Sequence, residues 1–265
     1  MSSVASLRPA SPALRQRRVG ELVSHLALRE IASAHRFTLL GWTWPLARQL
    51  VQLGVLVLVF SSVIKVGIDY FPAFVFSGLI AWSWFSTGVG GAAGVLVERR
   101  HLVFQPGFPA AALPVVAVAV PLIDLLIALP VLIGMLLLGP GIEPSALLFP
   151  LLVAIQAILM CGIAWITAAL TVFFRDVSHV VAVAVASLFY LTPVFYELSR
   201  VPEQYRDLLR LNPMTILIEG YHSILIDGEV PGLGGIAAVA AVSVAIALAG
   251  LAVFQRLEPS FVDEL

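Results

Sequence analysis

Long apolar runs separated by short polar segments set the pattern of this chain. Six such runs cover approximately residues 46–65, 71–96, 110–138, 145–173, 180–196 and 233–255. A helix needs roughly 20 residues to cross the hydrocarbon core of a bilayer, a length that all but the shorter fifth run approach or exceed. The runs are apolar on all sides, whereas the strands of a membrane barrel alternate apolar and polar residues. The pattern therefore predicts an all-α integral membrane protein with six transmembrane helices.

The polar segment before the first run has a helical pattern of its own. Residues 17–40 place apolar side chains at roughly helical spacing between Val19 and Ile31, with Arg29 and Arg36 among the intervening polar residues. A helix with one apolar and one charged face lies in the membrane interface. We therefore predict an N-terminal amphipathic interface helix that leads into the first span.

The longest polar interruption, residues 197–232, contains two further helical patterns. Pro202 opens the first, and Asn212-Pro213 separates it from the second, "MTILIEGYHSILI". Proline is favoured in the first turn of a helix because it has no N–H to leave unpaired. Both pieces are amphipathic, so we predict two short extracytoplasmic re-entrant helices before the last span, and no hydrophilic ectodomain.

Composition supports the membrane class, and basic residues orient the chain. Hydrophobic residues make up 60% of the 265 residues and charged residues 12%, against roughly 25% charged residues in soluble domains. With both termini inside, the inner segments hold Arg8, Arg15, Arg17, Arg18, Arg29, Arg36, Arg99, Arg100, Arg175 and Arg256, and the outer ones Lys65, Arg200, Arg206 and Arg210. The positive-inside rule then predicts a multi-pass protein of the cytoplasmic (inner) membrane with cytoplasmic N and C termini.

These patterns divide the chain into four parts. The first residues are rich in Ser, Pro and Arg and lack the apolar core of a signal peptide. The predicted parts are a disordered cytoplasmic tail at 1–16, the amphipathic interface helix at 17–40, a six-helix transmembrane domain at 41–255 and a cytoplasmic C-terminal tail at 256–265.

Several kinds of chemistry have no matching motif in the sequence. Cys161 is the single cysteine, so no intrachain disulfide or thiolate cluster forms. The five histidines stand singly, and there is no Gly-x-x-x-x-Gly-Lys-Ser/Thr phosphate loop. The glycine-rich "GVGGAAG" lies inside an apolar run, where small residues favour close helix packing. The sequence therefore shows no ATP-binding motif of its own.

The order of these parts resembles the permease subunit of polysaccharide-exporting ABC transporters, a branch of the ABC type-2 permease superfamily. The resemblance rests on "FTLLGWTWPLARQLVQ", "FSGLIAWSWFSTGV", "GFPAAALP", "FFRDVSH" and "LTPVFYELSRVPEQYRDLLRLNPMTILIEGYHSILIDGEVP". It implies a homodimeric channel with one ATP-binding subunit on each copy, a 2+2 assembly. ATP and magnesium would bind the partner subunit, with no cofactor in this chain. The implied cargo is a lipid-linked polysaccharide such as an O-antigen, a galactan or a teichoic-acid-like glycan, moved among membrane lipids and without nucleic acid.

Aromatic residues are the main candidates for the substrate pathway. Flat apolar rings let the C–H faces of sugars slide past without deep binding points. The alternative is the ordinary belt of Trp and Tyr at membrane interfaces. The candidates are Trp82, Trp84, Phe85, Phe189, Tyr190, Phe195 and Tyr196.

The resemblance also suggests where the ATPase docks and where the outer mouth closes. Docking is assigned to a coupling helix with Glu98, Arg99, Arg100 and His101 and to the interface-helix residues Arg29 and Arg36; the alternative is a positive-inside anchor. The extracytoplasmic gate is assigned to the segment with Pro202, Asn212, Pro213 and Glu219; the alternative is a connector that returns the chain.

Polar residues within the spans leave several roles open. Asp124 either makes an interhelical hydrogen bond or contacts the cargo, and Gln52 and Gln156 are either packing amides or hydrogen-bond donors to a glycan. Two other functions remain as alternatives: a related ABC permease that exports a drug or lipid, and a membrane-embedded transferase. The transferase is disfavoured because the sequence lacks a cluster of acids or histidines.

Overall fold

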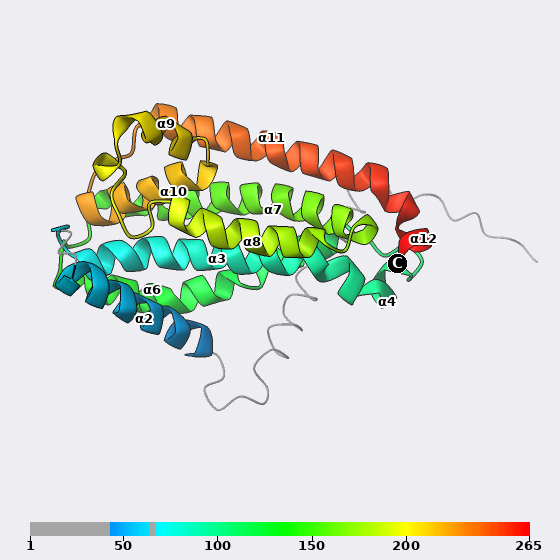
Figure 1. Ribbon diagram of the computed structural model, residues 1–265, viewed down its shortest axis with the longest axis horizontal. Coiled ribbons are helices and arrows are strands. Elements are labelled where there is room, and N and C mark those ends of the chain that lie inside the picture. Colours follow the sequence, from blue (N-terminus) through cyan, green and yellow to red (C-terminus); the bar gives the residue numbers. More distant parts are fainter. Residues whose placement is uncertain (1–42, 64–66) are drawn as a thin grey trace, which may run out of the picture.

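The computed structural model describes residues 43–63 and 67–265, and within them every regular element is helical (Figure 1). Five helices in these ranges are long and apolar enough to span a membrane, which confirms the all-α membrane class. They are α2 (Trp44–Val57) continued by η2 (Leu58–Val63), α3 (Phe71–Glu98), α5 (Ala112–Ala119) followed by α6 (Leu122–Leu138), η3 (Pro144–Leu148) leading into α7 (Phe149–Phe173), and α11 (Leu233–Leu257). The predicted tail at 1–16 and interface helix at 17–40 lie outside the described residues.

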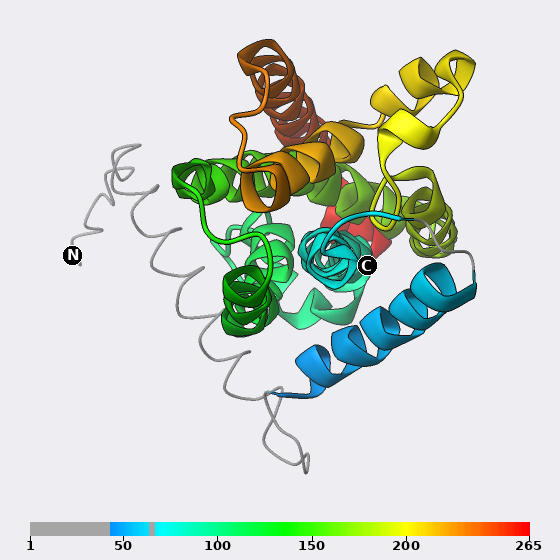
Figure 2. The same ribbon diagram turned by 90° about the vertical axis from the view of Figure 1, so that its left-hand side faces the viewer.

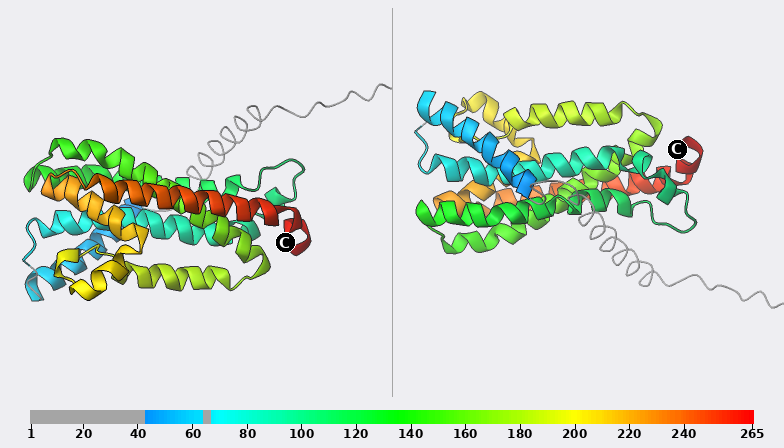
Figure 3. Two further views of the ribbon diagram at one scale, coloured as in Figure 1. Left: turned by 90° about the horizontal axis from the view of Figure 1, so that it is seen from above. Right: turned by 90° about the horizontal axis from the view of Figure 1, so that it is seen from below.

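Most of the shorter helices lie at the two ends of the bundle, whereas α8 runs along its side (Figure 1). Figure 3 shows the long helices side by side, with α9 and α10 at one end and α4 and α12 at the other. The shorter elements are α4 (Arg100–Val103), α8 (Val177–Leu191), η4 (Leu198–Arg200), α9 (Glu203–Arg210), α10 (Pro213–His222), η5 (Ser223–Asp227), η6 (Glu258–Ser260) and α12 (Phe261–Glu264).

Helix α3 lies at the centre of the bundle. It packs against α2, α5, α6, α7, α8 and α10, and Figure 2 shows it end-on with other helices around it. Val75 and Phe76 have no exposed surface at all. This helix therefore organises the apolar core that the other spans share.

Prolines set several helix boundaries, and one of them divides a predicted span. The apolar run predicted at 110–138 breaks around Pro121 into α5 and α6, because proline has no N–H to continue the hydrogen-bond ladder of the preceding helix. Similarly, α8 ends at Leu191, and Thr192 before Pro193 is extended, as expected for a residue that precedes proline.

The fifth predicted run differs from the other five in length. It forms α8, which has 15 residues and therefore rises about 22 Å, less than the hydrocarbon thickness of a bilayer. Residues beyond Pro193 do not extend this helix. The run at 180–196 thus yields a short apolar helix where the sequence predicted a full span.

Residues 256–265, which the sequence assigns to a C-terminal tail, are folded. Helix α11 continues to Leu257, and η6 and α12 then turn back against the ends of the long helices. The Phe261 ring is fully buried and lies 5.2 Å from the Phe254 ring, centroid to centroid. This contact holds the end of the described chain beside α4 (Figure 1).

Helices α7 and α11 cross at two glycines. A Cβ on Gly162 would lie 2.6 Å from the backbone nitrogen of Ala247, and a Cβ on Gly250 would collide with the backbone of Gly162. Real Cβ atoms do not approach backbone this closely, so the two helices touch only because the side chains are absent. Small residues at helix crossings are the usual means of tight packing in membranes.

We predict that Gly162→Ala lowers the melting temperature of the purified protein in detergent, because the added methyl group forces α7 and α11 apart. Overpacking of this kind costs about 1–3 kcal/mol. Gly134→Ala in α6 is the matched control, since nothing lies within 4 Å of the added Cβ there. Equal melting temperatures for the two variants would contradict the crossing geometry.

Candidate functional site

A groove runs between α2, α3 and α8. Its volume is about 490 Å³. Helix α8 contributes small residues together with Phe189 and Tyr190, α3 contributes Trp82 and several hydroxyl side chains, and α2 contributes Arg48 and Gln52. The groove therefore has an aromatic part and a polar part, and three of the seven aromatic candidates line it.

A chain of aromatic rings continues from this groove toward the end of the bundle that carries α9 and α10. Successive centroids are 5.1 Å apart for Phe85 and Trp82, 5.9 Å for Trp82 and Phe189, 5.6 Å for Phe189 and Phe195, 5.1 Å for Phe195 and Phe60, and 6.3 Å for Phe60 and Phe71. Such separations are typical of favourable aromatic pairs. The sequence prediction missed Phe60 and Phe71, because only the fold brings η2 against the segment after α8.

The remaining aromatic candidates divide between the groove's outer end and the core. Tyr196 lies 5.3 Å from Phe195, centroid to centroid, and also lines a second cavity. Trp84 lies apart from the groove: it is buried, and its Nε1 donates to the carbonyl oxygen of Val118 on α5 at 2.9 Å. In the structure, Trp84 therefore fastens α5 to α3.

The segment assigned to the outer gate begins with two well-defined helix starts. Pro202 is the N-cap residue of α9, and Asn212 caps α10 by accepting a hydrogen bond from the Met214 N–H at 3.0 Å. The Asn212 side chain also donates to the Thr192 hydroxyl at 2.9 Å, just after α8. Asn212 thus links the start of α10 to the end of α8, and Pro213 occupies the first turn.

Helix α10 is inserted among the long helices through a buried hydrogen-bond chain. The Tyr221 hydroxyl donates to Oε1 of Gln156 on α7 at 3.0 Å, and Nε2 of Gln156 donates to the carbonyl oxygen of Ala81 on α3 at 2.8 Å. Tyr221 and Gln156 have no exposed surface. Of the roles left open for Gln156, the structure thus shows an amide that joins three helices.

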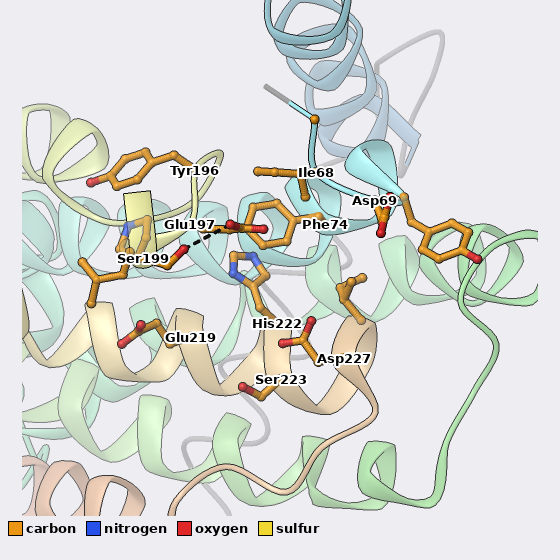
Figure 4. Close-up of a pocket in the computed structure, with 15 residues that line it drawn as sticks. Ile68, Asp69, Phe74, Tyr196, Glu197, Ser199, Glu219, His222, Ser223 and Asp227 are labelled. Carbon is orange, nitrogen blue, oxygen red and sulfur yellow. Dashed lines mark hydrogen bonds between the residues drawn. The ribbon is translucent and has the colours of Figure 1, made fainter. Parts of the chain in front are cut away.

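A second cavity of about 470 Å³ opens beside α10 and is rich in acids (Figure 4). Asp69, Glu197, Glu219 and Asp227 line it, together with His222. The Glu197 carboxylate accepts from Arg200 Nε at 3.1 Å and from the Ser199 hydroxyl at the same distance. A cavity with this charge repels anions.

Burial shifts the titration of several groups around this cavity. Burial, followed by the carboxylates of Glu229 and Glu197, raises the pKa of Asp227. Burial also raises the pKa of Glu219, and the Arg210 guanidinium offsets only part of this rise. His222, stacked on Phe74 with centroids 3.8 Å apart, has its pKa lowered to about 3, chiefly by burial. The imidazole is therefore neutral near pH 7.

The residues assigned to ATPase docking lie at the opposite end of the bundle. Helix α3 ends at Glu98, and Arg99 leads into α4, which contains Arg100 and His101. Glu98, Arg100 and His101 are exposed, and Arg99 is half-buried. Leu102 and Val103 anchor the other face of α4 in the cluster around Phe261. Arg29 and Arg36 lie outside the described residues.

Comparison with known proteins gives one family match and several full-length relatives. A family model described as "ABC-2 type transporter" matches residues 21–226. The O-antigen export system permease protein RfbA of Myxococcus xanthus is 36% identical over 252 residues, which are 93% of this chain and 95% of the relative. RfbA of Klebsiella pneumoniae is 23% identical over 248 residues, 92% and 95% of the two chains. The polysialic acid transport protein KpsM of Escherichia coli is 24% identical over 244 residues, 89% and 93% of the two chains.

We predict that Tyr221→Phe lowers the melting temperature, because it leaves Oε1 of Gln156 buried without a donor. The expected cost is about 1–3 kcal/mol. Adding Gln156→Leu should cost less than the sum of the two single substitutions, because both remove the same hydrogen bond. Tyr205→Phe on the exposed face of α9 is the control, and additive effects of Tyr221→Phe and Gln156→Leu would contradict the link.

We also predict a pH-dependent effect of Asp227→Asn. Because the pKa of Asp227 is raised in the folded protein, the folded state binds the proton more tightly, and stability falls as pH rises from the unfolded-state pKa through the folded-state pKa. Asp227→Asn should therefore raise the melting temperature at pH 7 and give no such gain at pH 4. Asp207→Asn on α9 is the control, and an equal gain at both pH values would contradict the assignment.

Proposed function

The chain belongs to the ABC-2 type transporter family, and from this we propose that it forms the channel of an ABC exporter for lipid-linked polysaccharide. The family makes it a multi-pass membrane subunit, a permease without a nucleotide-binding domain. The observation that carries the proposed cargo is the 36% identity over 93% of the chain to an O-antigen export permease. ATP and magnesium would bind a separate ATP-binding subunit.

The chain of aromatic rings supports a carbohydrate cargo. Its exposed part runs from Tyr190 and Phe189 in the groove to Phe195 and Tyr196 near the end that carries α9 and α10, while Trp82 is buried behind Phe189. A sugar ring has apolar C–H faces that rest on aromatic rings, while its hydroxyl groups remain free for hydrogen bonds. A row of rings without deep pockets lets successive sugars advance by equivalent steps.

We assign α8 to the fifth of six membrane crossings, completed at its outer end by the residues that lead into the outer segment. Helix α8 is too short alone, but its end continues through Phe195 into α9 and α10, which Asn212 and Tyr221 attach to the bundle. In the proposed orientation α9 and α10 lie on the extracytoplasmic side as re-entrant helices. There the segment with Pro202, Asn212, Pro213 and Glu219 closes the outer mouth between passages of glycan.

A second copy of the chain is proposed to complete the channel. Apolar side chains of α2 and α8 are widely exposed in one copy: Val51 and Val183 each have 68% of their surface exposed and Val180 has 65%. These helices flank the groove, so a copy packed against them encloses the groove and leaves the rest of the bundle facing lipid.

The ATP-binding subunit is proposed to dock on α4 and the residues beside it. Glu98, Arg99, Arg100 and His101 present both charge signs at the cytoplasmic end in this orientation. Leu102 and Val103 hold α4 to the bundle, so movement of a docked subunit is transmitted to α3. Arg29 and Arg36 are proposed as a second contact.

The direct test is depletion of the protein in its native cell, followed by measurement of lipid-linked and surface polysaccharide. We expect full-length lipid-linked glycan to accumulate on the cytoplasmic leaflet while the surface glycan disappears, since synthesis continues and export stops. A shorter or smaller lipid-linked pool would indicate a role in synthesis. No change in either pool would indicate a different cargo.

A further inference from the structure

Arg48 is the cation of the groove between α2, α3 and α8. It is exposed to the groove, and among the described residues it makes no hydrogen bond or ion pair. No acid is found among the described residues that line this groove. Arg48 is the fifth residue of α2, and from there its long side chain can extend along the groove with the guanidinium at the polar end. The groove therefore favours an anionic group beside Arg48.

The hydroxyl groups next to Arg48 are arranged to bind a ligand that both donates and accepts hydrogen bonds. The Ser83 hydroxyl accepts from Nε2 of Gln49 at 3.1 Å, which leaves its own proton free to donate. The Ser86 hydroxyl donates to the carbonyl oxygen of Ser83 at 3.1 Å, which leaves its lone pairs free to accept. Gln52 and Thr87 line the same stretch. Sugar hydroxyl groups have this dual character.

The order of these groups follows from the helices that carry them. Along α3 the groove extends from Leu79 to Gly90, a rise of about 16 Å. Gln49 is bonded to Ser83 and Phe60 lies beside Phe71, so the two segments run antiparallel and Arg48 lies on the Thr87 side of Ser83. The guanidinium thus lies at the Thr87 end of the groove, the serine hydroxyl groups lie in the middle, and the Gln52 amide and the aromatic rings lie toward the Leu79 end.

We infer that this groove binds the junction between a lipid phosphate and its first sugar. Arg48 holds the phosphate, because a guanidinium fork matches two phosphate oxygens. Gln52, Ser83 and Thr87 hydrogen-bond the sugar, and the exposed ring of Tyr190 receives the C–H face of the next ring. This inference rests on the proposed function, to which it adds the position of the lipid-to-glycan linkage.

The test measures binding to the purified complex of permease and ATP-binding subunit in detergent. The probes are farnesyl diphosphate, farnesol, and farnesyl diphosphate joined to one hexose. We expect farnesyl diphosphate to bind at least tenfold more tightly than farnesol. Arg48→Gln should remove this difference and Arg48→Lys should keep part of it. Arg256→Gln on α11 is the matched control for loss of one positive charge.

The sugar contacts have a separate readout. The hexose should tighten binding further, and Thr87→Val, which keeps the shape but loses the hydroxyl, should reduce that gain without changing the affinity for farnesyl diphosphate. Unchanged binding by Arg48→Gln, or equal binding of farnesol, would overturn the inference. Equal displacement by phosphatidylglycerol would also overturn it, because the site would then hold an ordinary membrane headgroup.

Export in cells separates this inference from the proposed function. If depletion of the protein abolishes surface glycan but Arg48→Gln restores export fully, the exporter assignment stands and the phosphate site is wrong. If depletion leaves the surface glycan intact while Arg48 still discriminates farnesyl diphosphate from farnesol, the site stands and the polysaccharide cargo is wrong.

Discussion

Close packing around α3 is the constraint on which the other helices depend. Lipid tails are as apolar as leucine side chains, so helices in a bilayer associate through tight contact and hydrogen bonds. A Cβ on Gly78 would lie 3.0 Å from the carbonyl oxygen of Val194, and a Cβ on Gly88 would meet Met160. At both positions the missing side chain lets a neighbour reach α3. The positions of α7 and of the segment after α8 follow from these approaches.

Buried and half-buried hydrogen bonds then attach individual helices to this centre. Gln49 joins α2 to Ser83, Trp84 joins α5 to α3, and Gln156 joins α7 and α10 to the carbonyl of Ala81. Within a membrane such groups have little water to bond if they separate. A small number of polar side chains therefore specifies which helices meet and in what register. The apolar residues around them do not specify this pairing.

The two cavities of the bundle have opposite electrostatic character. The groove beside α2 contains Arg48 and, in the described residues, no acid, whereas the cavity beside α10 contains Asp69, Glu197, Glu219 and Asp227. An anion is attracted to the first and repelled by the second. For a cargo with a charged linkage and a neutral glycan, this difference favours binding of the linkage in the groove beside Arg48. The acidic cavity beside α10 does not bind the charged linkage.

The sequence by itself determined the all-α membrane class and most helix limits, because run length and proline positions act locally. Pro202 and Asn212, for example, mark the starts of α9 and α10 as expected. The tertiary structure decided which side chains share a site. Trp82 and Trp84 both looked like pathway residues, yet one lines the groove and the other bonds to α5. Helices that are apolar on every side give no periodicity to distinguish a packed face from a pathway. Contacts such as Phe60 with Phe195 join residues far apart in the chain, so only the placement of whole helices reveals them.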